Sequence, residues 1–234
     1  MESKLDRETI ITLYASFDAP ATALDCGEKC APYNDYGVPF CCDSGQAVPA
    51  AYASEWAYLQ ENTDLWHLWE SDDEEHAALL RQETPQGMVL VECQGHRHCQ
   101  RRYRSIACRS FPFFPYITRS GEFIGLSYYW EYEDRCWLIS HLDRVTRRYR
   151  EEFIQAYDTI LDCIPQEREN FGHYAETMRQ RFAQQNRPIL LLHRDGGLYA
   201  LSPQDEQLTP IRADDLPKFG VYELAAEMPF ADER

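Results

Sequence analysis

Residues 26–42 read CGEKCAPYNDYGVPFCC and open a part of the chain that is dense in cysteine. A second stretch, CQGHRHCQRRYRSIAC at 93–108, holds three more cysteines, and Cys136 follows in EDRCWL. Eight of the nine cysteines therefore lie between positions 26 and 136. Cysteines that only pack in a core have no reason to gather in this way, whereas metal ligands and disulfide partners do. The function that the sequence predicts depends on which of these two explanations holds.

The composition shows that a stable fold does not require cross-links. Hydrophobic residues make up 44% and aromatic residues 13% of the 234 residues, which is ample for a domain core. The first residues, MESKLDRETI, lack the apolar stretch of a secretory signal, and no run approaches the ~18 apolar residues of a membrane helix. We therefore expect a cytoplasmic protein with no membrane partner. Thiols stay reduced in that compartment, so clustered cysteines there indicate metal binding or redox chemistry.

The charge of the chain limits its partners. The formal net charge is −16, and a nucleic-acid partner is not expected because such binding needs a cationic face. The same charge argues against docking on anionic lipid. The sequence leaves open which redox or protein partner the chain meets, and we interpret the excess of acidic residues as favouring solubility.

The patterning predicts an α+β fold in two parts. Residues 20–140 are expected to form a cysteine-cluster metal-binding domain, an irregular core with short strands and helices. Residues 141–234 are expected to form an amphipathic helix pair and a β-hairpin packed on the first part. Glycine and proline in 26–42 predict a loop, and apolar spacing in 48–60 predicts a helix. The run GMVLVEC predicts a strand that ends at Cys93.

Further elements are read from periodicity and turn residues. The stretch 8–17 predicts a strand or short helix, and 111–132 predicts two strands joined by the turn RSGE. Apolar residues from Leu142 to Leu161 share one helical face, and 167–185 resembles a second helix. The stretch PILLLHRDGGLYALS predicts a hairpin with DGG at its turn. The acidic C-terminal end is expected to be loose.

The cysteines themselves are the candidate metal ligands. Thiolates bind zinc or the iron of iron–sulfur clusters, and four close a site, so eight suffice for two sites. Adjacent side chains diverge in both strands and helices, so Cys41 and Cys42 do not readily share one metal. Either each serves a different site, or one binds metal and the other packs. The eight candidates are Cys26, Cys30, Cys41, Cys42, Cys93, Cys99, Cys108 and Cys136.

Basic residues surround the second cysteine group. No acidic residue interrupts the segment from Cys93 to Arg109, and its basic side chains are His96, Arg97, His98, Arg101, Arg102, Arg104 and Arg109. Cationic neighbours favour the thiolate and would offset the charge of a four-thiolate cluster. The alternative is a basic patch for an anionic substrate or partner. Either histidine could complete a Cys/His site, although the cysteines take priority. Cys163 is interpreted as a small buried hydrophobic residue.

With these residues set out, the chain resembles the YkgJ-type cysteine-cluster family, described as zinc- or iron-chelating domains. The family pattern is CxxxC, then CC, then a later cysteine pair, an RPxxCRxFP-like segment and one further cysteine. The matching residues in order are Cys26, Cys30, Cys41, Cys42, Cys93, Cys99, Arg104, Cys108, Arg109, Phe111, Pro112 and Cys136. Two departures are a longer spacer between Cys30 and Cys41 and Ser105 in place of the family's proline.

The resemblance implies a metal site, with iron and zinc both open, but it implies no reaction. We expect an iron–sulfur protein with one or two clusters and a role in redox chemistry or electron transfer, with Arg104 and Arg109 near the cluster or an anion. The alternatives are a zinc-stapled binding module without catalysis and a cluster-dependent modification enzyme. Some relatives resemble flagellin lysine methylases, so the sequence leaves open whether the chain is an enzyme.

Overall fold

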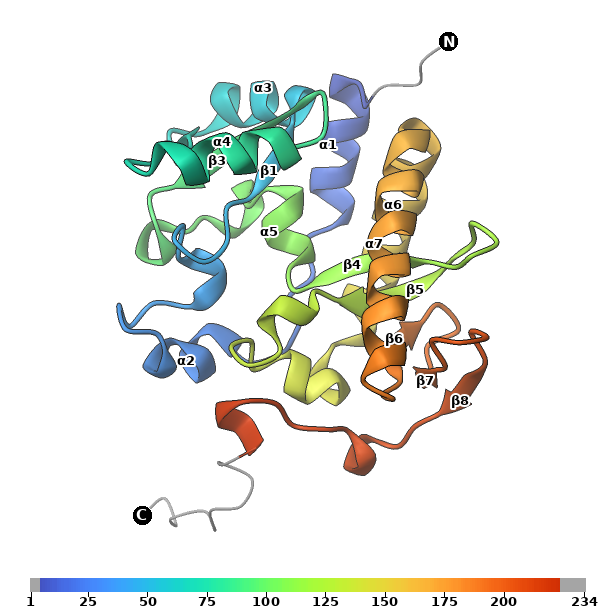
Figure 1. Cartoon of the computed structure of the whole chain (residues 1–234). Coiled ribbons are helices and arrows are strands. Elements are labelled where there is room, and N and C mark those ends of the chain that lie inside the picture. The colour runs from blue at the N-terminus through green and yellow to red at the C-terminus, as the bar shows by residue number, and fades with distance from the viewer. Residues whose placement is uncertain (1–4, 224–234) are drawn as a thin grey trace.

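The computed structural model describes residues 5–223, and these residues adopt an α+β fold with two antiparallel sheets (Figure 1). The C-terminal stretch predicted to be loose falls mainly at 224–234, outside the described residues. Across 5–223, no helix has the combination of length and apolar character that crossing a bilayer requires. The predicted α+β class is therefore confirmed.

Two helices begin where an aspartate caps them. Helix α1 (Arg7–Ser16) starts after Asp6, whose carboxylate accepts the Thr9 N–H at 2.8 Å, so the uncertain stretch 8–17 is helical. Helix α2 (Cys26–Cys30) follows Asp25, which accepts the Gly27 N–H at 2.9 Å. The prediction of a loop across 26–42 was therefore wrong at its start. Two short 3₁₀ turns, Ala31–Tyr33 and Phe40–Cys42, also lie within the region predicted to be a loop.

The smaller sheet carries Cys93. Its strand order is β1-β3-β2, with β1 at Ala50–Tyr52, β2 at Trp66–Leu68 and β3 at Met88–Cys93, so the predicted strand ending at Cys93 is confirmed. Helix α3 (Ala53–Asn62) begins later than predicted because residues 50–52 pair with β3 instead. Helix α4 (Glu74–Glu83) lies between β2 and β3 in the chain.

The larger sheet combines strands from both predicted parts of the chain. Its order is β4-β5-β6-β7-β8, and all its strands are antiparallel. Both predicted hairpins are present in it. The strand bounds are β4 (Phe113–Ile117), β5 (Phe123–Tyr128), β6 (Ile189–His193), β7 (Leu198–Leu201) and β8 (Leu208–Pro210).

Helices α6 (Arg147–Cys163) and α7 (Pro165–Gln184) pack on this sheet (Figure 1). The apolar face predicted for the first of them is buried, including Tyr149, Phe153 and Leu161. The N-terminal segment is attached to the start of α6 by a β-bridge between Thr22 and Val145. The two predicted amphipathic helices are therefore confirmed, and their buried faces hold the sheet to the rest of the molecule.

The short helix α5 (Ile106–Ser110), which carries Cys108, is held by buried polar groups. Ser105, the departure from the family pattern, caps it by accepting the Cys108 N–H at 3.2 Å. Glu55, fully buried on α3, accepts the Ile106 N–H at 2.6 Å and the Tyr14 hydroxyl at 2.7 Å. These bonds fix α5 against α1 and α3, and burial raises the pKa of the Glu55 carboxyl.

We expect Glu55→Ala to lower the free energy of unfolding by about 2–4 kcal/mol, because it leaves three buried donors, the Tyr14 hydroxyl and the N–H groups of Ile106 and Tyr52, without their acceptor. Urea denaturation followed by circular dichroism measures this loss. Glu61→Ala is the matched control on the same helix, since Glu61 forms only an exposed ion pair with Arg7 at 2.8 Å. Such surface pairs contribute about 0–1 kcal/mol. Equal losses in the two variants would contradict the role given to Glu55.

Candidate metal centre

Four of the predicted ligands come from α2, the 3₁₀ turn Phe40–Cys42 and the segment after β5. Burial raises the pKa of the Cys136 thiol, and charge on Cys26 and Cys30 raises it further. Burial and then the charge of Cys30 raise the pKa of Cys26 to about 11. The pKa of Cys41 is raised first by its hydrogen bond to Cys42 and by burial, and then by the charges of Cys42, Cys136 and Cys26. We call this set the first group: Cys26, Cys30, Cys41 and Cys136.

The other four predicted ligands form the second group: Cys42, Cys93, Cys99 and Cys108. Burial raises the pKa of Cys108 to about 12, and charge on Cys42 and Cys93 contributes. The pKa of Cys93 is raised first by burial and then by Cys42 and Cys99. All four thiols line one small cavity of about 90 Å³, together with Cys41, His96 and Arg104. The second group therefore lines a small cavity that it shares with Cys41 of the first group.

The adjacent residues Cys41 and Cys42 connect the two groups, because charge on Cys42 also raises the pKa of Cys30 and Cys41 also lines the small cavity. Both residues lie in the 3₁₀ turn Phe40–Cys42, with their Sγ atoms 4.0 Å apart. The hydrogen bond between the two sulfur atoms raises the pKa of Cys41 and lowers that of Cys42. That each of the two cysteines serves a different site stays a prediction from the sequence.

The two arginines singled out in the sequence have different partners. Arg104 donates from Nε to Cys99 Sγ at 3.0 Å. Burial opposes the charge of Arg104, but this bond and the nearby thiolates raise its pKa. Arg109 instead donates to backbone carbonyls, among them Arg104 O at 2.9 Å and Arg102 O at 2.7 Å. Within the described residues Arg109 bonds to no thiol, so Arg104 is the arginine that acts on the cysteines.

The two histidines also differ. His96 is half-buried and lines the small cavity, whereas His98 is exposed. Cys163, at the end of α6, is partly buried against the hydrophobic core and joins neither group. Of these three residues, His96 is the one placed to contact a metal beside the second group.

Side chains of the two groups are neighbours but are not gathered around a point. Within residues 5–223, no three Cys, His, Asp or Glu side chains converge closely enough to hold an ion as they stand. All nine thiols are free of disulfide bonds. A donor set made of thiols, with a cationic guanidinium beside it, nevertheless has the chemistry that zinc or an iron–sulfur cluster requires.

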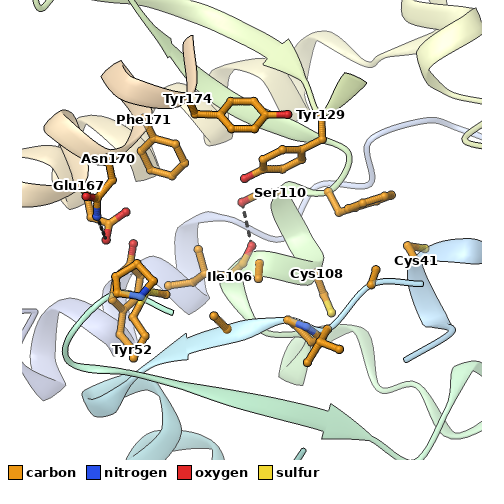
Figure 2. A pocket seen from close by; sticks show the side chains of 18 of the residues that line it. Cys41, Tyr52, Ile106, Cys108, Ser110, Tyr129, Glu167, Asn170, Phe171 and Tyr174 are labelled. Carbon is orange, nitrogen blue, oxygen red and sulfur yellow. Dashed lines mark hydrogen bonds between the residues drawn. The ribbon is translucent and has the colours of Figure 1, made fainter. Parts of the chain in front are cut away.

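A larger cavity that the sequence did not predict lies beside the thiols. Its volume is about 480 Å³, and Cys41 and Cys108 line both this cavity and the small one. Figure 2 shows these two cysteines on one side and Glu167 with Asn170 on the other. A signal was present in the sequence, because Glu167 shares the apolar stripe of α7 with Phe171 and Tyr174. An acidic residue at a core position is unusual enough to mark a site.

Comparison with models of known families, with curated proteins and with solved structures found no match to this chain. The resemblance to the YkgJ-type family therefore stays a prediction, and the geometry of the cysteine groups carries the functional argument.

The thiols of the reduced, metal-free protein should differ in reactivity. Cys42 has a lowered pKa and is half-buried, so near neutral pH more of it is thiolate and it should react first with iodoacetamide. Cys108, whose pKa is raised to about 12, should react slowly. Peptide mass spectrometry over time measures both rates, and circular dichroism shows that the protein stays folded. Faster modification of Cys108 than of Cys42 would refute the assignment.

Proposed function

We propose that this chain is a metal-binding protein with two thiolate centres of the iron–sulfur type and a redox or electron-transfer role. One observation carries the proposal. The adjacent residues Cys41 and Cys42 lie among the six other candidate cysteines, because charge on Cys136 and Cys26 acts on Cys41 and charge on Cys42 acts on Cys30, Cys93 and Cys108, and eight thiols suffice for two centres of four. Four thiolates are the ligand set of the common iron–sulfur clusters. In a reducing cytoplasm these thiols stay free to bind.

The residues around the thiols support iron over zinc. A bound cluster would supply one-electron redox chemistry, and its net negative charge is costly in a buried place. Arg104, through its bond to Cys99, would neutralise part of that charge in the second group. Tyr222 lies beside the first group, where burial and then the charges of Cys30 and Cys136 raise its pKa. Its ring helps to keep water from the first group.

One observation favours a zinc site as the second candidate. His96 lines the small cavity with the second group, and a mixed Cys/His set is a common structural zinc site. Zinc bound there would staple β3, α5 and the 40–42 turn together without redox chemistry. The colour of the protein separates the candidates, because thiolate-bound iron absorbs broadly near ~400 nm and bleaches on reduction whereas zinc is colourless.

Substitution of single cysteines should remove one centre and spare the other. We expect Cys136→Ser to lose the metal of the first group and Cys93→Ser to lose that of the second, each lowering metal per chain by about half. Likewise Cys41→Ser and Cys42→Ser should each affect a different centre. Metal analysis by plasma mass spectrometry after anaerobic purification measures this, with Cys163→Ser as the matched control. If Cys41→Ser removes all metal and Cys42→Ser none, there is one site and the proposal of two centres fails.

Replacing Arg104 should tune the potential of the second centre. Arg104→Met removes a positive charge beside Cys99, which disfavours the more negative reduced state and should lower the reduction potential. A redox titration followed by electron paramagnetic resonance measures the shift. Arg102→Met is the control, because Arg102 is exposed and stacks over the Tyr103 ring at 4.7 Å. An unchanged potential in Arg104→Met would show that Arg104 does not neutralise the centre.

A further inference from the structure

The larger cavity is a chamber with aromatic walls. It lies between β1, α5, the residues after β5 and α7, and its volume of about 480 Å³ is that of a small-molecule site. Figure 2 shows the rings of Tyr129, Phe171 and Tyr174 gathered on one side of it. Phe171 and Tyr174 come from α7, and both contact the Phe114 ring, with centroids 6.5 and 4.7 Å away. The walls are therefore held in place by packing.

The chamber contains a buried carboxyl group that lacks a cationic partner among the described residues. Glu167 lines it and is only 6% exposed, and its side chain accepts a single long hydrogen bond, from Asn170 Nδ2 at 3.5 Å. Among residues 5–223 it forms no ion pair, and burial raises its pKa. Glu83 also lines the chamber, and none of the described lining residues is Lys, Arg or His. A buried carboxylate normally has a partner, so the missing partner points to a ligand.

The aromatic rings favour the same kind of ligand as the carboxylate. The faces of Tyr and Phe rings attract cations, and the attraction grows when water is excluded. Glu167 lines the same cavity as Tyr52 and Tyr129 (Figure 2). An anionic ligand would meet the carboxylate and the ring faces without any compensating positive charge.

We propose that this chamber binds a small organic cation, a protonated amine on an apolar body, with Glu167 as its counter-ion and the rings as its walls. The apolar body lies along Phe171, Tyr174 and Tyr129, toward the end lined by Cys41 and Cys108. Bound ligand thus sits beside thiols of both groups. Binding in the chamber does not depend on metal in those groups, so it can be tested apart from the proposed function.

Calorimetric titration of the protein as purified with phenethylamine, 2-phenylethanol and 3-phenylpropionate tests the proposal, because the probes share an aromatic body and differ in charge. We expect the amine to bind about tenfold or more tightly than the alcohol, as a charge-assisted bond to a buried carboxylate predicts, and the acid not to bind. Glu167→Gln should reduce the affinity for the amine to that for the alcohol. Glu169→Gln, on the exposed face of the same helix, is the control and should change neither the affinity for the amine nor that for the alcohol.

Phe171→Leu provides a second test that keeps the carboxylate. It removes a ring face but little apolar volume, so it should weaken the amine more than the alcohol. Metal analysis of each variant shows whether the cysteine groups are intact, which separates failure here from failure of the proposed function. The proposal is overturned if phenethylamine does not bind at millimolar concentration, if the acid binds more tightly, or if Glu167→Gln leaves the preference for the amine unchanged.

Discussion

The buried guanidinium of Arg109 holds together the segments that surround the thiols. It donates to the carbonyls of Tyr14 and Phe17 at the end of α1 and to those of Arg102 and Arg104 in the loop before α5. A buried cation is tolerated only with such a full set of acceptors. Cys99 precedes the loop and Cys108 follows it on α5, so Arg109, together with Glu55 and Ser105, fixes the separation of these two thiols. Everything proposed for the second group rests on this arrangement.

Local patterns in the sequence were sufficient to predict the elements that neighbouring residues determine, such as amphipathic helices and hairpin turns. The apolar face of α6 and the turn residues RSGE and DGG predicted the right structures, and GMVLVEC ended at Cys93 as expected. Helix α2 at the start of 26–42 was not predicted. The glycine and proline residues of this region indicated a loop, and a single capping residue, Asp25, is a weak signal for a helix. The predicted helix 48–60 included residues 50–52, which form strand β1. These three residues are a strand because they pair with β3, and the local sequence does not show this pairing.

For the candidate site as well, the sequence predicted which residues are involved but not how they are arranged in space. The order of the cysteines identified eight candidate ligands, but their division into two groups depends on chain segments far apart in sequence. Arg104 and Arg109 look equivalent in the sequence, yet one donates to a thiol and the other to the backbone. Glu167 was read as part of a helix face, and its meaning appears only when the rings of Tyr52 and Tyr129 are seen beside it. Three-dimensional proximity, which single-sequence periodicity does not report, accounts for what was missed.

The pairing of β5 with β6 has a consequence for how the protein is made. Gly125 pairs with His193 and Leu126 with Leu192, so the larger sheet cannot close until residues near 193 have left the ribosome. The cysteine-rich segment is synthesised first. The β-bridge between Thr22 and Val145 cannot form until Val145 has been synthesised. During that interval the thiols of the nascent chain lack their final surroundings and are open to oxidation and to chance cross-linking. The order of strand pairing therefore sets how long the thiols of the nascent chain depend on a reducing environment.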